Sequence, residues 1–251
     1  MLLVEDNSIN REFVIHFLNE WKVSFQVAVN GKQGVEIAHM TDFDLILMDV
    51  SMPLLDGYQA TKKIRSFDNI RKSTPIVAMT ANVFEEDIEK CLNSGMNDYI
   101  SKPFRADELK LKIHNLVKGN RNLSTHKNQV RKSKSNEKKE EHVFSLDLLK
   151  EMGGNNQAFV NDMIRIYIEE SPKTLQKLSE AHNDWNIDGI KSSAHKLRSP
   201  SAMMGVSKAV ELTEFIEVNV SKSEKQDEVK SAIVRLIDLI QLVIEQAKSI
   251  S

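Results

Sequence analysis

The amino-acid sequence predicts two folded parts of different class, an α/β part with a parallel sheet followed by an all-α part. In residues 1–117, short apolar runs alternate with amphipathic stretches, which is typical of strands and helices in a parallel sheet. Residues 143–251 show helical periodicity and no strand signal. Between them, residues 118–142 are basic and almost without large apolar side chains, so we expect a flexible linker there.

The first part is expected to hold five strands and five helices in alternation. Residues 45–48 form a continuous apolar run, typical of a central parallel strand that is covered on both faces. Residues 23–29 alternate instead, as a half-buried strand does. The other strands are expected at 2–4, 76–79 and 99–100, and the helices at 9–21, 31–40, 58–67, 84–93 and 105–117. This order predicts a doubly wound parallel sheet with right-handed crossovers.

The second part is expected to be an antiparallel helical bundle, because short connections join its amphipathic segments. In the last segment, apolar side chains recur at helical spacing from Val229 to Ala247. Pro172 falls inside the second segment and is expected to kink that helix. The helices are expected at 143–152, 157–181, 187–204, 207–218 and 224–248.

Composition and charge narrow the class of protein. The net charge of −2 divides into −4 over residues 1–117, +5 over 118–142 and −3 over 143–251, which argues against nucleic acid as a direct partner. The basic linker has no interleaved aromatic side chains for base stacking, which favours a solvated tether. No apolar run approaches the roughly 20 residues of a membrane span, and no signal peptide is evident. Cys91 is the only cysteine, which fits a cytoplasmic protein.

Polar side chains follow four of the expected strands, at the edge where the carboxyl ends of parallel strands meet. Glu5 and Asp6 follow the first strand, Asp49 the third, Thr80 the fourth and Lys102 the fifth. Three carboxylates at one edge repel each other and need a cation, for which Mg²⁺ with its oxygen ligands is suited. An aspartate after a strand is common in turns, but these groups in this order predict a site that accepts a phosphoryl group on Asp49.

These residues stand in motifs that resemble the response-regulator receiver family over essentially all of residues 1–117. The motifs are Leu3-Val4-Glu5-Asp6-Asn7, the run from Asp44 to Pro53, Asp56-Gly57, Met79-Thr80-Ala81-Asn82 and Ser101-Lys102-Pro103-Phe104. The resemblance implies a flavodoxin-like fold and phosphorylation of Asp49, with Mg²⁺ held by Glu5, Asp6, Asp49 and the backbone carbonyl of Ser51. It also implies that Thr80 and Lys102 contact the phosphoryl group, that Tyr99 is the switch aromatic, and that the Lys102–Pro103 bond is cis.

In the second part, His195 differs from the other histidines by its neighbours on the expected helix. Lys191, Arg198 and Ser199 lie four before, three after and four after it, and so share its face. A neutral imidazole can attack a phosphoryl group, and a cation and a hydroxyl beside it would stabilise the product. By itself, a histidine between basic residues more often belongs to a solvated helix face.

The surrounding sequence resembles the histidine phosphotransfer (HPt) family, which makes His195 the expected phosphoacceptor. The resemblance rests on residues 194–198, on Gly205 ten residues after His195, and on the stretches 153–159 and 171–172. Where the family usually has a small pair after the basic residue, this chain has Ser199-Pro200. Pro200 removes one helical hydrogen bond, which leaves the geometry of the docking surface open.

Together the two resemblances imply a phosphorelay protein like the C-terminal end of a hybrid sensor histidine kinase. The expected partners are a sensor histidine kinase, which could be the parent chain, and a downstream response-regulator receiver. Because no kinase catalytic core is recognisable, we expect no direct use of ATP, only self-catalysed phosphorylation and dephosphorylation at Asp49. The sequence begins inside an expected strand, which indicates part of a longer protein.

Other classes of function fit less well. A DNA-binding regulator would need a basic recognition helix, but the helical part is net acidic. A scaffold that uses the α/β part for docking alone should lack the acidic pair, the acceptor or the lysine, and none of these is missing. An independent enzyme has no support beyond the chemistry of Asp49 itself.

Overall fold

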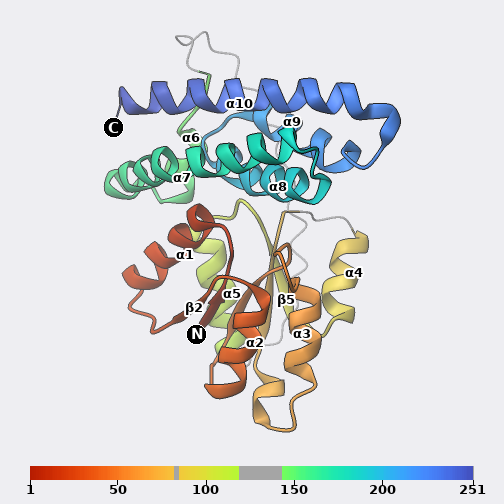
Figure 1. The fold of residues 1–251 in the computed structure, drawn as a ribbon. Coiled ribbons are helices and arrows are strands. Elements are labelled where there is room, and N and C mark those ends of the chain that lie inside the picture. The colour runs from red at the N-terminus through yellow and green to blue at the C-terminus, as the bar shows by residue number, and fades with distance from the viewer. Residues whose placement is uncertain (82–84, 119–142, 251) are drawn as a thin grey trace.

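The computed structural model describes residues 1–81, 85–118 and 143–250, and it has the two predicted parts (Figure 1). A five-stranded parallel sheet has the order β2-β1-β3-β4-β5, as predicted for a doubly wound fold. The strands are β1 (Leu2–Val4), β2 (Gln26–Ala28), β3 (Ile46–Asp49), β4 (Ile76–Thr80) and β5 (Asp98–Ser101). The fold class is therefore confirmed for both parts.

The helices of the sheet part are α1 (Ser8–Glu20), α2 (Gly31–Met40), α3 (Gly57–Arg65), α4 (Glu85–Asn93) and α5 (Ala106–Val117), with a 3₁₀ turn η1 (Ile70–Ser73). Several of them begin at a side-chain cap, which satisfies backbone N–H groups of the first turn. Asn7 accepts from two such groups in α1, and Asp56 caps α3 in the same way. The caps fix the direction in which each helix leaves the edge of the sheet.

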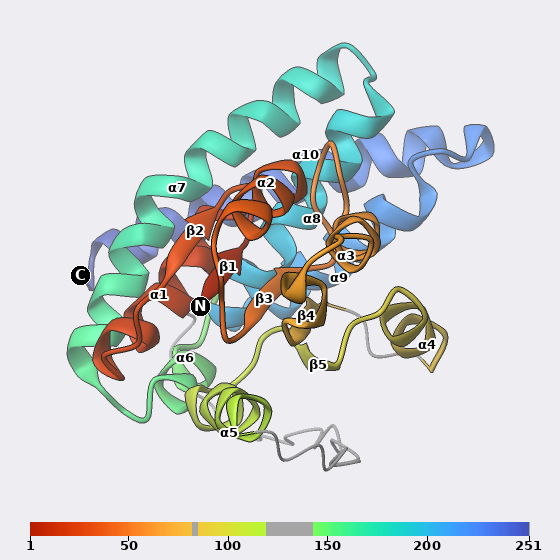
Figure 2. The same ribbon diagram turned by 90° about the horizontal axis from the view of Figure 1, so that it is seen from below.

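Alternation along the strands divides the sheet between two apolar layers. Leu3 and Leu47 face the layer formed with α1 and α5, whereas Val4 and Met48 face α2, α3 and α4. Figure 2 shows these two groups of helices on opposite faces of the sheet. The central strands are buried on both faces, which explains their continuous apolar sequence.

The second part is an all-helical bundle. Its helices are α6 (Asp147–Met152), α7 (Gln157–Asn183), α8 (Ile187–Met203), α9 (Ser207–Asn219) and α10 (Gln226–Lys248), with a 3₁₀ turn η2 (Ser223–Lys225). Helix α8 packs against α7 and α9, and α10 packs against α7 and α9. None of the helices within the described ranges is long and apolar enough to cross a membrane.

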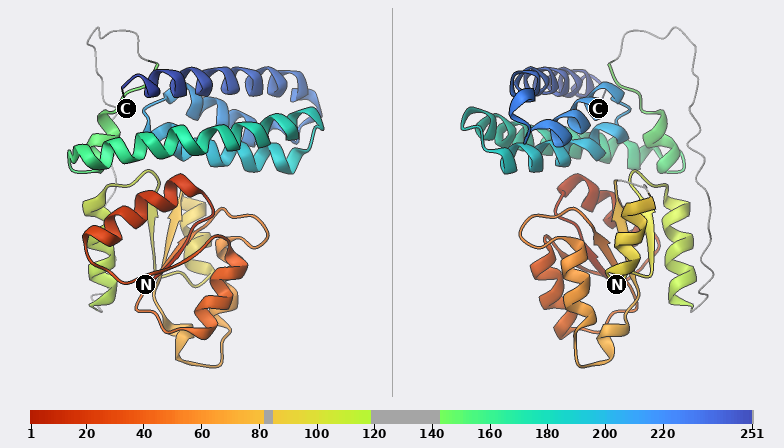
Figure 3. Two further views of the ribbon diagram at one scale, coloured as in Figure 1. Left: turned by 60° about the vertical axis from the view of Figure 1, so that its left-hand side comes forward. Right: turned by 90° about the vertical axis from the view of Figure 1, so that its right-hand side faces the viewer.

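The bundle lies across the edge of the sheet at which the strands end (Figures 1 and 3). Helix α1 packs against α7, and aromatic rings meet there from both sides. The ring of Phe159 in α7 lies 5.7 Å from Phe13 and 5.0 Å from Phe17, measured between centroids. One continuous apolar cluster therefore runs from the α1 face of the sheet into the bundle.

Some predicted bounds were wrong for physical reasons. Strand β2 has three residues instead of the predicted 23–29, because its ladder with β1 runs only from Gln26, opposite Leu2, to Ala28, opposite Val4. Helix α6 begins at Asp147 instead of residue 143, because the N–H of Ser145 donates to the carbonyl of Met204 at 3.1 Å. The expected linker after Lys118 and the start of the helix predicted at 84–93 lie outside the described residues.

Candidate functional site

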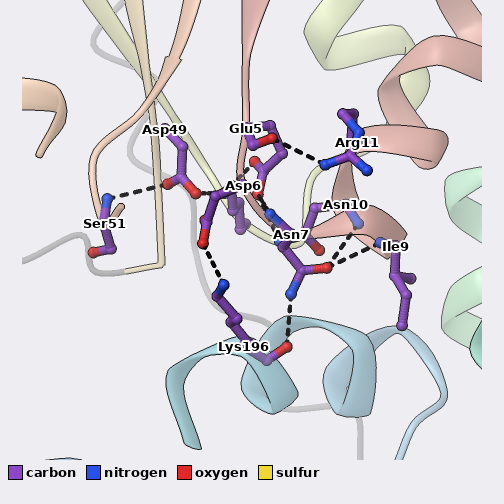
Figure 4. Close-up of polar contacts among 10 residues, drawn as sticks. Glu5, Asp6, Asn7, Ile9, Asn10, Arg11, Asp49, Ser51 and Lys196 are labelled. Atoms are coloured by element: carbon purple, nitrogen blue, oxygen red, sulfur yellow. Dashed lines mark hydrogen bonds and ion pairs between the residues drawn. The ribbon is translucent and has the colours of Figure 1, made fainter. Parts of the chain in front are cut away.

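Three carboxylates meet at the edge of the sheet that faces the bundle (Figure 4). Glu5 and Asp6 follow β1, and Asp49 is the last residue of β3. One carboxylate oxygen of each lies within 4.8 Å of those of the other two. Glu5 and Asp49 are buried, so their charges repel each other with little solvent screening. The structure thus brings together the acidic residues that the sequence predicted.

Lys102 supplies a positive charge to this cluster. Its Nζ donates to Glu5 Oε2 at 2.6 Å and lies 2.9 Å from Asp49 Oδ2. The Lys102–Pro103 peptide bond is cis, as the resemblance implied, and the N–H of Lys102 donates to the carbonyl of Thr80 at 2.7 Å. Lys102 therefore comes to the cluster from the carboxyl end of β5, at the same edge of the sheet.

The charges of this cluster act on each other's ionisation. Burial first, and then the negative charge of Asp49, raise the pKa of Glu5 to about 8, although Lys102 opposes this shift. Burial alone would lower the pKa of Lys102, but the negative charges of Asp49 and Glu5 outweigh burial and raise it. A cation that joined the cluster would favour the ionised form of Glu5.

The donor set fits a hard divalent cation. Glu5, Asp6 and Asp49 offer oxygen ligands within 4.8 Å of one another, and carboxylate oxygens are what Mg²⁺ prefers. Ser51 lies two residues after Asp49, and its N–H donates to Asp49 Oδ1 at 3.2 Å. Gly57 closes this loop: a Cβ there would lie 2.2 Å from the carbonyl oxygen of Asp49.

Thr80 and Tyr99 lie on the neighbouring strands β4 and β5. Thr80 is the buried last residue of β4, next to Ala81, which lines the same cavity as Asp49. Tyr99 lies on β5 and is half-buried, and Lys112 Nζ lies 5.4 Å from the centre of its ring. The predicted contact of Thr80 with a phosphoryl group and the predicted switch role of Tyr99 stay predictions.

His195 lies in the middle of α8 and is half-buried. Its Nδ1 lies 3.0 Å from Oε2 of Glu217 in α9, and a carboxylate at that distance accepts the Nδ1 proton. This hydrogen bond leaves the lone pair on Nε2. Sequence reasoning missed Glu217, because its spacing of 22 residues from His195 on another helix gives no periodic signal.

The three residues predicted to support His195 are placed differently. Arg198 and Ser199 line the same cavity as His195, and Arg198 Nη1 lies 3.7 Å from Glu217 Oε1. Lys191 is exposed on α8 and does not line this cavity. The structure therefore brings Arg198 and Ser199 to the histidine.

A small cavity between the two parts is lined from both sides. Asp49 and Lys102 line it from the sheet part, and His195 and Ser199 from the bundle. Its volume is about 10 Å³, which is roughly the room for one water molecule or ion. The two predicted phosphoacceptors thus face one shared space.

Polar contacts hold the bundle over this cavity. Lys196 Nζ forms an ion pair with Asp6 Oδ2 at 2.7 Å, and Asn7 Nδ2 donates to the backbone carbonyl of Lys196 at 2.7 Å (Figure 4). Ser8 Oγ donates to Glu170 Oε2 at 2.8 Å. Farther out, Arg105 Nη1 lies 2.9 Å from Glu151 Oε1 on the surface.

Family models match both parts of the chain. The response regulator receiver domain matches residues 1–114, and the Hpt domain matches residues 162–249. The chain is a two-component phosphorelay signalling protein. It carries a response regulator receiver domain followed by an Hpt domain, an arrangement supported by its similarity to BarA-like hybrid kinases.

Relatives cover the chain to different extents. The signal transduction histidine-protein kinase BarA of Shigella flexneri is 28% identical over 253 residues, which is 100% of this chain and 27% of that protein. The chain therefore spans about a quarter of the length of this relative. The transcription factor SKN7 of Saccharomyces cerevisiae is 41% identical over 109 residues, 43% of this chain and 17% of that protein.

Among solved structures, the chain is similar to the receiver domain of sensor histidine kinase PA1611 from Pseudomonas aeruginosa, crystallised with magnesium in its active site cleft. The identity is 40% and the TM-score 0.44, covering 47% of this chain and 95% of that one. The described residues of the present chain form the two signalling domains and include no kinase catalytic domain.

Proposed function

We propose that Asp49 accepts a phosphoryl group in a Mg²⁺-dependent step and that His195 of the same chain exchanges this group with it. The observation that carries the proposal is the shared cavity, which Asp49 and Lys102 line from one side and His195 from the other. Both acceptors face the same space, and apolar packing holds the domains around it.

We propose Glu5, Asp6, Asp49 and the backbone carbonyl of Ser51 as the ligands of Mg²⁺. The ion would neutralise charge on the phosphoryl oxygens as the group is transferred. Lys102 stands 2.9 Å from Asp49 Oδ2 and would hold a second phosphoryl oxygen. The Thr80 hydroxyl is a candidate donor to a third, and Tyr99 a candidate switch residue.

The transfer itself needs only the groups at the cavity. Nε2 of His195 attacks the phosphorus, a P–N bond forms, and the P–O bond to Asp49 breaks with its electron pair returning to the carboxylate. The Nδ1 proton stays on the ring and is held by Glu217 at 3.0 Å, whose negative charge offsets the positive charge that the imidazole ring gains on forming the P–N bond. Arg198 and Ser199 would stabilise the phosphoryl oxygens on His195.

The proposed partners follow from this chemistry. A sensor histidine kinase would supply the phosphoryl group to Asp49, and a downstream response-regulator receiver would accept it from His195. We propose no direct use of ATP, and only self-catalysed gain and loss of phosphate at Asp49.

The test uses acetyl phosphate as the donor, with and without Mg²⁺, on the wild type and on Asp49→Asn and His195→Gln. An acyl phosphate is lost in base and a phosphohistidine in acid, so the two labels can be separated. We expect base-labile label that Asp49→Asn abolishes and acid-labile label that needs both residues. Label on Asp49 that never reaches His195 would contradict transfer within the chain. Folded wild-type protein without Mg²⁺-dependent label would contradict the whole proposal.

A further inference from the structure

One backbone carbonyl of α8 has lost its helical partner. In an α-helix the carbonyl of residue 196 accepts from the N–H of residue 200, but Pro200 has no N–H. Pro200 is buried, and α8 continues past it to Met203. The carbonyl oxygen of Lys196, the residue after His195, can therefore accept a hydrogen bond from a donor outside the helix.

The donor of this hydrogen bond is Asn7 of the receiver domain. The side-chain amide of Asn7 donates from Nδ2 to the Lys196 carbonyl at 2.7 Å. The orientation of this amide is fixed, because its Oδ1 already accepts from the N–H groups of Ile9 at 3.0 Å and Asn10 at 3.2 Å. The side chain of Asn7, at the N-cap of α1, is thus oriented so that its Nδ2 donor points away from α1 toward the Lys196 carbonyl.

Lys196 is held at both of its ends. Its ammonium pairs with Asp6 Oδ2 at 2.7 Å, while its carbonyl accepts from Asn7. Asn7 is itself tied to the acidic cluster, since its N–H donates to Glu5 Oε1 at 3.3 Å. Two contacts on one residue fix both the position and the rotation of α8 over the cluster, and with them the direction of the neighbouring imidazole.

We infer that Lys196 is the residue by which the Hpt domain docks on the receiver domain of its own chain, and that Pro200 makes its carbonyl available for this purpose. The partner group that this carbonyl recognises is a side-chain amide at the N-cap of α1. Lys196 and Asn7 are positioning residues, because they orient His195 and touch no reacting atom. The inference rests on the proposed transfer between Asp49 and His195.

Pro200→Ala separates docking from the stability of the helix. The alanine N–H would bond to the Lys196 carbonyl inside α8, which competes with Asn7. A proline inside a helix is unfavourable, so this variant should raise the melting temperature of the bundle. We expect the single-turnover rate from Asp49 to His195 to fall at the same time, by roughly three- to tenfold, as for the loss of one hydrogen bond. A purely structural role of Pro200 predicts higher stability with an unchanged rate.

Asn7→Ser tests the other partner. Serine keeps the preference for the N-cap of α1 but cannot reach the Lys196 carbonyl. We expect a similar fall in the transfer rate, while the labelling of Asp49 by acetyl phosphate and Mg²⁺ reports whether the acidic cluster is intact. The double variant Asn7→Ser/Pro200→Ala should be no slower than the slower single variant, because both changes remove the same contact. Pro172→Ala is the matched control, because it replaces an exposed proline inside α7. It should leave the rate of transfer from Asp49 to His195 unchanged.

The outcomes separate this inference from the function on which it rests. Wild-type protein that labels Asp49 but never His195 would refute the transfer itself. Normal transfer in the wild type together with unchanged rates in Asn7→Ser and Pro200→Ala would refute the docking role alone. Independent, multiplicative effects in the double variant would also refute it, because they would place the two residues in different contacts.

Discussion

At Glu5, the stability of the metal-free protein and the binding of a cation place opposite requirements on one side chain. Its carboxylate is fully buried beside Asp49, and the contact with Lys102 only partly offsets the cost of this charge. A group in this position destabilises the metal-free protein and strengthens the binding of a cation. Stability and cation affinity should therefore respond in opposite directions to its removal.

Glu5→Gln tests this relation. We expect the free energy of unfolding in metal-free buffer to rise by about 1 kcal/mol, because folding no longer has to bury a carboxyl group whose pKa it raises, while Lys102 keeps its contact with Asp49. The affinity for Mg²⁺ should fall by about tenfold or more, because an oxygen ligand with full charge is lost. Urea unfolding and titration calorimetry measure the two effects. Glu36→Gln, an exposed change on α2, should alter neither; a less stable Glu5→Gln protein would refute the account.

In the Hpt domain, Glu217 is the carboxylate that contacts His195. Its hydrogen bond to Nδ1 sets the tautomer of His195, so Glu217→Gln should slow transfer from Asp49 by about 10- to 100-fold. Labelling of Asp49 should not change, because Glu217 lies on α9 and does not line the cavity that Asp49 and His195 share. Glu214→Gln, an exposed change one turn earlier on α9, is the control. Equal transfer rates in the two variants would show that the carboxylate does not orient the imidazole.

At the scale of elements, apolar patterning predicted all five strands and the ten α-helices of the described residues, because the central strands are buried and the apolar faces of the helices pack against them or against each other. The bounds were less predictable where pairing decides them. Residues 23–25 alternate like a strand, yet the regular pairing with β1 begins only at Gln26. The positions of Glu5, Asp6, Asp49 and Lys102 were predictable, because parallel strands bring their carboxyl ends to one edge.

The start of α3 tests how an element positions Asp49. Gly57 is the first residue of α3, and a Cβ there would lie 2.2 Å from the carbonyl oxygen of Asp49. Because that neighbour is backbone, Gly57→Ala must displace the loop after β3. We expect the variant to lose about 2 kcal/mol or more of stability and most of the labelling of Asp49. Gln59→Ala, exposed on the same helix, should retain both in urea unfolding and acetyl phosphate assays.

At the scale of the whole molecule, the sequence predicted two domains but not how they lie together. The contacts between them join residues far apart in the chain, such as Asn7 with Lys196 and Phe13 with Phe159. No periodicity within either domain reports such pairs. Phe13 and Phe17 could be predicted as apolar positions of α1, but their partner on the other domain could not.

The continuous apolar cluster predicts that the two domains unfold together. Phe159 carries this coupling, because its ring meets Phe13 and Phe17 of α1 and is fully buried. Cys91 makes the receiver domain separately observable: it is the only cysteine, it is buried, and burial raises the pKa of its thiol. Its labelling by a thiol reagent in urea reports unfolding of the receiver domain, and loss of helical circular dichroism reports mainly the larger helical content of the bundle.

We expect the two signals to change at the same urea concentration in the wild type. Phe159→Ala should cost about 3–5 kcal/mol and separate them into two transitions, because it removes the ring that joins the domains. Leu236→Ala is the matched control: this fully buried residue lies in α10, the helix on the far side of the bundle from the sheet (Figure 1). That variant should lower the midpoint and keep a single transition. Two transitions already in the wild type would mean that the docked arrangement adds no stability, and contact between Asp49 and His195 would then depend on transient encounters.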